Sequence, residues 1–280
     1  MITCHLQGGL GNQIFQIFAT ISYAIKNKTK FNFLNVKSHG GGSTVLRYTF
    51  WETFFSRLKL FLISKFPQVY VIKENEFSFN ELPILKIKQD LLLYGYFQSY
   101  KYFQQDYEII CRVIGIEKMK NTLLTKINLE TNFFEDTVSI HFRIGDYKNL
   151  QDYHPITPYI YYETALKYIQ SNTDREKKYN VIYFCENVDI DEVLIMVKRL
   201  EEEFLNYKFI RCDETLADWE QLLFMSCCHH NIIANSSFSW WGGYFNLWKD
   251  KIVCYPAVWF GENIKHKTKD LCPEEWIKIY

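Results

Sequence analysis

The chain has 280 residues, and its 32 Lys and Arg residues balance 32 Asp and Glu residues, so the formal net charge is zero. This balance gives no general electrostatic attraction to nucleic acid or to an acidic membrane, so any anionic ligand must be held by local groups. The length favours two α/β lobes or one large one, and the 18% aromatic content can supply cores and stacking surfaces for sugars or bases.

The cysteines and the apolar segments indicate a reducing, aqueous compartment. The eight cysteines include no C-x-x-C pair, and several lie in apolar segments, which is typical of reduced, buried thiols. The chain does not open with a basic segment followed by an apolar run, and no stretch reaches the roughly 20 apolar residues that span a bilayer. We therefore expect a soluble, cytoplasmic protein without a signal peptide or membrane anchor.

The first elements predict a parallel sheet. A short strand over 2–6 precedes a glycine-containing loop, a helix follows with apolar residues at helical spacing to about residue 25, and 31–36 forms a second strand. The glycine-rich segment 38–43 shows no periodicity, which fits a mobile lid or a surface excursion, and we favour the excursion.

The middle of the chain contains a predicted lobe boundary. Residues 50–66 are apolar at helical spacing, a strand over 91–94 runs into Gly95-Tyr96-Phe97-Gln98-Ser99, and another helix follows. Residues 121–135 are polar and interrupted, so we divide the chain there into lobes 1–130 and 131–280.

The second lobe alternates regularly between strands and helices. We predict strands over 137–142, 181–185, 207–211, 231–234 and 252–255, with helices over 157–170, 189–204, 216–227 and 235–248 between them. Thr157 would cap the first helix, with Pro158 at its first position. This pattern predicts a doubly wound α/β lobe with a parallel sheet.

One polar segment directly follows the 137–142 strand. His141, Arg143 and Asp146 place two potential cations and a carboxylate where ligands bind in open α/β sheets. The guanidinium of Arg143 is a rigid fork that suits two phosphate oxygens, so a diphosphate is the natural ligand. The alternative is a strand end with a surface ion pair between Arg143 and Asp146.

A second anion-binding candidate lies between the first strand and the first helix. Gly9-Leu10-Gly11 resembles the start of a dinucleotide fingerprint, but Ile14 stands where that motif needs Gly or Ala, so NAD binding is excluded. The glycines still let backbone amides approach an anion, and Asn12 and Gln13 add side-chain amides. Equally, the glycines could serve only the packing of strand against helix.

A third candidate is Asn235-Ser236-Ser237-Phe238-Ser239, whose hydroxyls and amides could hold phosphate at a helix start. Ser236 or Ser237 could instead be a simple N-cap, whereas we assign Trp240 and Trp241 to the core.

Metal chemistry is not expected. Asp189-Ile190-Asp191 has a D-x-D form, but it opens a helix, where we favour capping over metal binding. Cys227-Cys228-His229-His230 is too closely spaced for the usual tetrahedral zinc site. Glu186, at the end of the 181–185 strand, could contact a nucleotide or simply end the strand.

Four motifs in register carry a family resemblance. Gly8-Gly9-Leu10-Gly11-Asn12-Gln13, Gly95-Tyr96-Phe97-Gln98-Ser99, His141-x-Arg143-x-x-Asp146 and Asn235-Ser236-Ser237-Phe238-Ser239-Trp240-Trp241 together resemble the family 11 glycosyltransferases, the alpha-1,2-fucosyltransferases. Two departures are that Cys185-Glu186-Asn187 stands where such proteins more often have Ser-Asp-Asp, and Ile144 where many have a second arginine.

The resemblance implies a GT-B-like α/β fold in which two Rossmann-type lobes with parallel sheets face a cleft. The lobe 1–130 would bind the acceptor and the lobe 131–280 the nucleotide sugar. The implied activity is inverting transfer of L-fucose from GDP-L-fucose to a glycan hydroxyl, with the 2-hydroxyl of galactose as the expected acceptor group, without a metal or other cofactor. A transferase for another GDP-sugar and a non-catalytic glycan-binding protein stay open, whereas a hydrolase would need a close carboxylate pair that the sequence does not offer.

The implied site has two groups of residues. Arg143, Asp146 and Asn12 are the predicted catalytic residues, with Asp146 and Glu186 as candidate bases. The predicted donor-binding residues are Gly9, Gly11, Asn12, Gln13, His141, Arg143, Glu186, Asn235, Ser236, Ser237 and Phe238.

Overall fold

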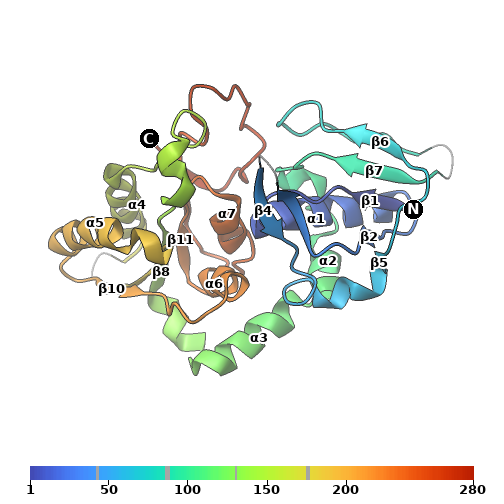
Figure 1. The fold of residues 1–280 in the computed structure, drawn as a ribbon. Helices are drawn as coiled ribbons and strands as arrows, with labels where there is room; N and C mark the ends of the chain where they lie inside the picture. The colour runs from blue at the N-terminus through green and yellow to red at the C-terminus, as the bar shows by residue number, and fades with distance from the viewer. Residues whose placement is uncertain (42–43, 86–88, 130, 175–176) are drawn as a thin grey trace. The chain divides into compact units, whose positions relative to one another are not determined.

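The computed structural model describes residues 1–41, 44–85, 89–129, 131–174 and 177–280, which form two compact units (Figure 1). Unit 1 contains Met1–Lys118 and His266–Pro273, and unit 2 contains Met119–Lys265 and Glu274–Tyr280. The boundary falls inside helix α3 (Ile116–Ile127) and not after residue 130, because the first part of the polar stretch, up to Ile127, belongs to this helix.

Unit 1 also includes a segment from near the C-terminus that the sequence did not assign to it. Asp270 in this segment is buried, and its backbone carbonyl accepts a hydrogen bond of 2.6 Å from Ser99 Oγ. Its carboxylate lies 2.6 Å from Lys101 Nζ. Because of these contacts, no single cut in the sequence separates the residues of the two units.

The elements of unit 1 are short apart from one central helix. The strands are β1 (Ile2–Cys4), β2 (Phe33–Leu34), β3 (Ser38–Gly41), β4 (Thr44–Tyr48), β5 (Leu62–Ile63), β6 (Tyr70–Lys73) and β7 (Leu91–Tyr94), and the α-helices are α1 (Leu10–Lys26) and α2 (Tyr107–Ile114). The sheet has the order β1-β7-β6 with every pair parallel, as predicted from the opening strand and helix. Most of α1 is buried, because apolar side chains lie around its whole circumference.

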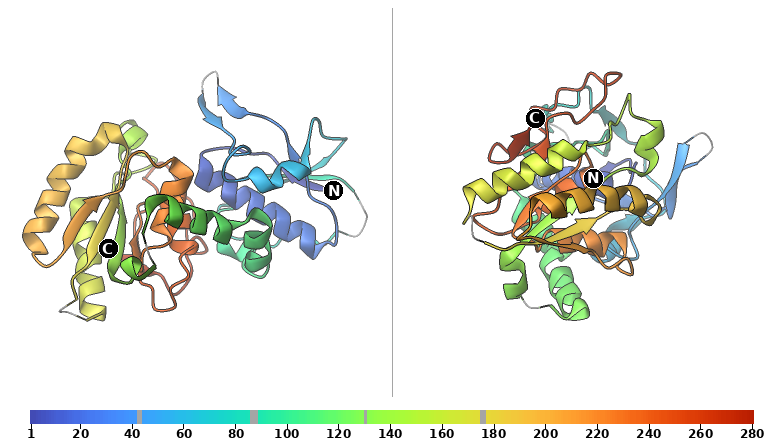
Figure 2. Two further views of the ribbon diagram at one scale, coloured as in Figure 1. Left: turned by 90° about the horizontal axis from the view of Figure 1, so that it is seen from below. Right: turned by 90° about the vertical axis from the view of Figure 1, so that its left-hand side faces the viewer.

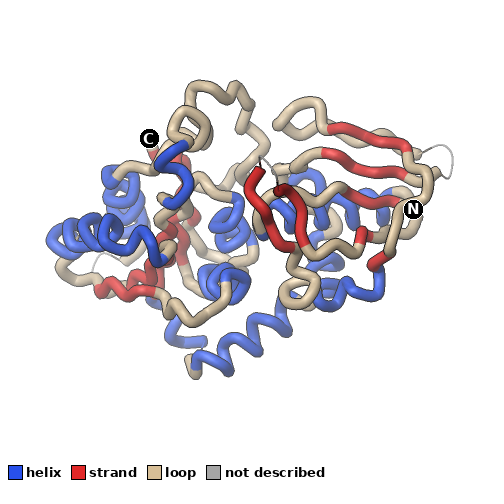
Figure 3. Tube along the Cα trace, viewed as in Figure 1, coloured by secondary structure: helices blue, strands red, loops and turns tan. Residues whose placement is uncertain are grey.

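Two predictions for unit 1 were wrong. The described part of the glycine-rich segment is not a loop, because β3 pairs with β4 in an antiparallel hairpin, drawn red in Figure 3; residues 42 and 43 lie outside the described residues. The predicted helix over 50–66 is replaced by turns, the short 3-10 helix Ser56–Phe61 and β5. The aromatic side chains of this segment fill a local core although its backbone is not an α-helix. Phe54 and Phe55, for example, are both 0% exposed.

Unit 2 contains the predicted doubly wound sheet. Its strands are β8 (Thr137–His141), β9 (Asn180–Phe184), β10 (Lys208–Arg211), β11 (His230–Ile232), β12 (Val253–Pro256) and β13 (Ile277–Ile279), and its remaining α-helices are α4 (Tyr159–Asn172), α5 (Ile190–Glu203), α6 (Asp218–Met225) and α7 (Ser237–Tyr244). The order is β10-β9-β8-β11-β12-β13, and all the pairs are parallel. The α/β class with parallel sheets is thereby confirmed.

The strand order identifies where a ligand would bind in unit 2. Numbered within the unit, the order is 3-2-1-4-5-6, in which the direction of winding reverses between β8 and β11. Helices α4 and α5 cover one face of the sheet, and α6 and α7 cover the other (Figures 1 and 2). Ligands of doubly wound folds bind at the carboxyl ends of the strands beside this switch point.

Three details of unit 2 differ from the sequence prediction. β13 is a sixth strand, and α7 ends at Tyr244, well before Trp248. Thr157 does not cap α4; its hydroxyl donates instead to Asn235 Oδ1 at 3.2 Å. Strand β13 has only three residues, so its local pattern is too short to distinguish it from a loop. Among the described residues, no helix is both long and apolar enough to cross a membrane.

Candidate active site

The polar segment singled out in the sequence lies at the switch point of unit 2. His141 is the last residue of β8, and Asp146 lies in the short 3-10 helix Gly145–Asn149 that follows. Asn235 and Ser236 follow the neighbouring strand β11. The structure therefore brings the two motifs of the second lobe to one edge of one sheet.

The guanidinium of Arg143 is held by two carboxylates. Its Nη2 lies 2.5 Å from Asp146 Oδ1, and its Nη1 is ion-paired with Glu186 Oε1. Burial opposes the charge, but Asp146, Tyr147 and Glu186 together outweigh that effect and raise the pKa of Arg143. The ion pair with Asp146, which the sequence offered as the alternative to diphosphate binding, is present, and Glu186 from the end of β9 joins it.

Tyr147 links the two motifs, and the sequence analysis missed it. The Arg143 guanidinium carbon lies 4.9 Å from the centroid of the Tyr147 ring. The Tyr147 hydroxyl donates a hydrogen bond of 3.1 Å to the backbone oxygen of Asn235. Tyr147 therefore connects the guanidinium to the loop after β11. The only sequence feature that could have marked Tyr147 is its position next to Asp146, and an ordinary surface tyrosine could stand in the same position.

His141 is not the second cation that the motif suggested. Burial, with a smaller contribution from Arg143, lowers the pKa of His141 to about 3, so the imidazole is neutral at physiological pH. Its ring lies 5.6 Å from that of Phe238, and its buried Nδ1 has no hydrogen-bond partner among the residues that the structure describes. His141 can offer a hydrogen bond to a ligand but no charge, because the neighbouring cation and the apolar surroundings both disfavour the imidazolium form.

Acid should destabilise the fold through His141 and His230, whose pKa values are both lowered by burial from 6.5 to about 3. Below pH 6.5 the unfolded chain binds protons that these folded imidazoles do not, so stability falls as the pH drops from 6.5 towards 3. We expect a loss of about 1.4 kcal/mol per histidine for each pH unit in this window. Urea denaturation at several pH values measures it. The His230→Gln variant should show a shallower dependence, and an unchanged slope would contradict the assignment.

Asp189 is the N-cap residue of α5, and its side chain positions the segment after β8. Its side chain makes no capping bond to α5 and is 1% exposed. Its Oδ2 accepts a hydrogen bond of 2.7 Å from the backbone nitrogen of Gly145, and its Oδ1 lies 3.0 Å from Lys148 Nζ. As predicted, acids begin this helix, with Asp189 at the N-cap of α5 and Asp191 in its first turn. The Asp189 carboxylate makes no capping hydrogen bond, because Gly145 and Lys148 take its two oxygens.

The polar groups after β11 are engaged within unit 2. Asn235 Nδ2 donates to the backbone oxygens of Pro155 and Trp259, at 2.9 and 3.2 Å. Ser236 is the N-cap of α7 and accepts a hydrogen bond of 3.3 Å from the Phe238 nitrogen. Asn235 and Ser236 thus shape the loop, while Ser237 and Phe238 are partly exposed at the start of α7. The roles of all four in donor binding stay predictions.

In unit 1 the structure joins the other two motifs. Gln98 Nε2 donates to Asn12 Oδ1 at 2.7 Å, and Gln13 Nε2 donates to the backbone oxygens of Gly8 and Tyr48, at 3.1 and 2.9 Å. Gln13 is fully buried, so its amide holds the loop in place. Gly9 is the N-cap of α1, and Gly11 lies in its first turn.

Glu74 is a further residue that the sequence analysis missed. Its carboxylate accepts hydrogen bonds from the backbone nitrogens of Tyr96 and Phe97, at 2.7 and 3.0 Å. Phe97 has a φ of 53°, a conformation that a non-glycine residue adopts only with support. Burial raises the pKa of Glu74. No motif marks this residue, since it follows β6, a strand that was not predicted.

A family comparison matches most of the chain. Residues 57–280 match the model of glycosyl transferase family 11. The chain belongs to this family. The matched range includes all of unit 2 and three of the four motifs that carried the resemblance.

Two curated relatives of this family 11 chain come from Escherichia coli. The O-antigen biosynthesis glycosyltransferase WbnK is 30% identical over 204 residues, which cover 70% of the chain and 63% of WbnK, so the aligned chain spans less than two thirds of that relative. An alpha-1,2-colitosyltransferase is 25% identical over 303 aligned positions, covering 100% of the chain and 99% of the relative.

Solved structures include more distant neighbours of the family 11 chain. A mutant of Arabidopsis thaliana FUT1 in complex with GDP has a TM-score of 0.47 at 10% identity, over 90% of this chain and 69% of that one. The alpha-1,6-fucosyltransferase NodZ soaked with GDP-fucose has a TM-score of 0.43 at 9% identity, over 86% and 91%.

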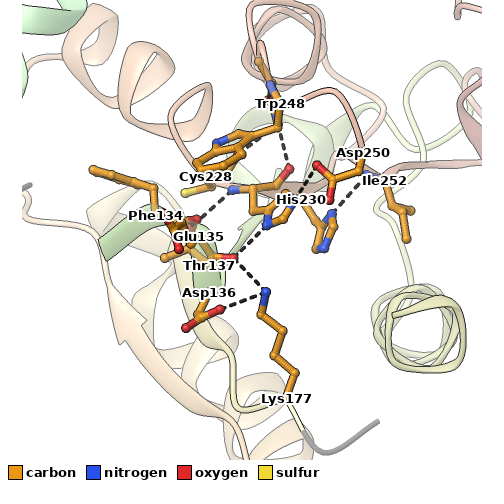
Figure 4. A network of polar contacts seen from close by, with 12 residues as sticks. Phe134, Glu135, Asp136, Thr137, Lys177, Cys228, His230, Trp248, Asp250 and Ile252 are labelled. Carbon is orange, nitrogen blue, oxygen red and sulfur yellow. Dashed lines mark hydrogen bonds and ion pairs between the residues drawn. The ribbon is translucent and has the colours of Figure 1, made fainter. Parts of the chain in front are cut away.

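The adjacent histidines of this family 11 chain belong to a hydrogen-bonded network (Figure 4). His229 Nδ1 lies 2.7 Å from the Glu135 backbone oxygen, and its Nε2 lies 2.9 Å from Asp250 Oδ1. His230 Nδ1 accepts from the Ile252 nitrogen at 3.0 Å. In the part of the chain that the structure describes, no three His, Cys, Asp or Glu side chains form a group able to hold a metal ion. Metal independence stays a prediction.

Proposed function

We propose that this family 11 glycosyltransferase transfers L-fucose from GDP-L-fucose to a glycan hydroxyl, with inversion at the anomeric carbon and without a metal ion. The proposed acceptor group is the 2-hydroxyl of a galactose. The observation that carries the proposal is the position of Arg143, a permanent cation at the switch point of a nucleotide-binding strand order. Family membership and the full-length similarity to an alpha-1,2-glycosyltransferase add support.

In the proposed reaction the acceptor oxygen attacks the anomeric carbon on the face opposite the diphosphate. The new C–O bond forms as the bond to the β-phosphate oxygen breaks, and GDP leaves. Arg143 neutralises the charge that develops on the β-phosphate, and His141 contributes a neutral hydrogen bond. The hydroxyl proton passes to Asp146 or Glu186, the two carboxylates beside Arg143.

A second donor has a specific observation in its favour. The alpha-1,2-colitosyltransferase aligns with the whole chain, and colitose is fucose without its 3-hydroxyl. A site that hydrogen-bonds the 3-hydroxyl rejects a donor lacking it, because its own polar group would be left unpaired. GDP-colitose is therefore the competing donor.

The decisive experiment supplies GDP-fucose or GDP-colitose with a panel of galactose-terminated glycans in buffer containing EDTA, and identifies the products by mass spectrometry. We expect fucosylated glycan and released GDP, at a rate that EDTA leaves unchanged. Faster transfer from GDP-colitose would reassign the donor, and loss of transfer in EDTA would overturn metal independence. Free fucose without acceptor modification would indicate a hydrolase, and glycan binding without GDP release would indicate a non-catalytic protein.

A further inference from the structure

The surroundings of Arg143 carry more negative than positive charge. Within the described part of unit 2, Arg143 is ion-paired with Asp146 and Glu186. Lys148, five residues later in the same segment, is ion-paired with Asp189 and Glu192. The formal balance is two negative charges in excess. Such a cluster would repel a diphosphate, although the site is proposed to bind one.

Both terminal nitrogens of Arg143 already have a carboxylate partner. Asp146 contacts Nη2 and Glu186 contacts Nη1. A bidentate complex with phosphate uses two N–H groups of the guanidinium, and the carboxylates already lie against both terminal nitrogens, which carry four of its five N–H groups. A diphosphate and both carboxylates therefore compete for one set of donors.

Electrostatic repulsion requires that one carboxylate move when a diphosphate binds. Two like charges about 4 Å apart repel by about 4 kcal/mol at the effective dielectric constant of a protein surface. A diphosphate placed on Arg143 beside both carboxylates would therefore lose much of the attraction to the guanidinium. Binding becomes favourable when one carboxylate turns away into water, where its charge is solvated.

Glu186 is the carboxylate better placed to leave. Its side chain is 51% exposed, against 41% for Asp146, and has one more rotatable bond. Asp146 lies three residues after Arg143 in the same short segment, whereas Glu186 reaches across from the end of β9. A Cβ on Gly145 would lie 3.0 Å from Glu186 Oε1, so a side chain at this position would crowd the Glu186 carboxylate.

We propose that Glu186 is an internal substitute for the donor diphosphate, which occupies Arg143 in the free protein and is displaced when the nucleotide binds. This inference rests on the proposed function. Glu186 keeps the partly buried guanidinium paired and oriented between turnovers. It also sets a threshold for entry, because a ligand must bring more charge to Arg143 than the single carboxylate that it displaces.

The test measures the affinity of GDP, pyrophosphate and guanosine by isothermal titration calorimetry for the wild type, Glu186→Gln and Glu192→Gln. Glutamine keeps the size of the side chain but removes the competing charge, so Glu186→Gln should bind GDP and pyrophosphate about tenfold more tightly. Guanosine affinity should not change. Glu192 is the matched control, because it is an exposed carboxylate on the same connection that pairs with Lys148 and not with Arg143; its variant should stay within about twofold of the wild type.

Unchanged or weaker binding of GDP and pyrophosphate by Glu186→Gln would overturn the proposal, as would wild-type protein that binds neither ligand. Equal tightening by Glu192→Gln would also overturn it, since the effect would then be general electrostatics. Glu186→Ala repeats the test if the glutamine hydrogen-bonds to Arg143. Sugar transfer by the wild type, assayed in parallel, separates the two proposals: transfer without tightening contradicts only the role of Glu186, and tightening without transfer contradicts only the transferase.

Discussion

Replacing Arg143 with alanine should lower sugar transfer by about 10² to 10³, the effect of removing one preorganised charge from the developing anion. The variant should remain folded, because the carboxylates left behind are 41% and 51% exposed and can be solvated by water. Steady-state kinetics with GDP-fucose and a galactoside acceptor measures the loss. Circular dichroism and thermal unfolding confirm that the fold is retained.

Arg143→Lys is the informative companion variant. Lysine keeps the charge but loses the planar fork, so its activity should lie between those of the wild type and of Arg143→Ala. If the alanine variant kept near-normal turnover, Arg143 would be no more than a surface ion-pair residue, and the assignment of the site would fail.

Replacing Trp240 with alanine should lower the stability of unit 2 by about 3 to 5 kcal/mol, as expected when a large core side chain is removed. Trp240 is 0% exposed, its ring stacks on that of Tyr244 at 4.6 Å, and it contacts Trp241 and Trp276. It anchors α7, whose first residues were predicted to contact the donor. Urea denaturation followed by far-ultraviolet circular dichroism gives the shift of the transition.

Leu247→Ala provides the control for this prediction. Leu247 is 72% exposed, so its truncation should change stability by less than about 0.5 kcal/mol. A loss below 1 kcal/mol in Trp240→Ala would mean that the tryptophan does not hold α7 against the sheet, and the position of Ser236 and Ser237 would need another explanation.

Most of unit 2 could be predicted from local patterns. The apolar run 181–184 is short and continuous, as in a strand buried on both faces, and polar residues follow its carboxyl end. Such alternation of strand and helix constrains the topology strongly, because parallel strands need crossover connections. The prediction was weaker for unit 1, where β2 and β5 have two residues each and give no usable period.

The partners of the site residues could not be predicted in the same way. Arg143 and Glu186 are 43 residues apart, and either could equally have paired with a nearer neighbour. Asp189 was predicted to cap a helix because acids often begin helices, yet its carboxylate accepts a hydrogen bond from the backbone nitrogen of Gly145. The cleft between the lobes and the donor-binding roles of Gly9, Gly11, Asn12 and Gln13 stay predictions.

The sequence by itself determined where most of the strands and helices of unit 2 lie and which polar residues follow each strand. This was possible because burial of one face imposes a repeating pattern on residues that are neighbours in the chain. The sequence placed His141, Arg143 and Asp146 at a strand end and Trp240 and Trp241 in the core. Only the tertiary structure decided the charges and contacts: burial makes His141 neutral, and the parallel pairing of β8 with β9 brings Glu186 to Arg143. Protonation and ion pairing depend on solvent exclusion and on distances across the sheet, and neither is a property of a segment alone.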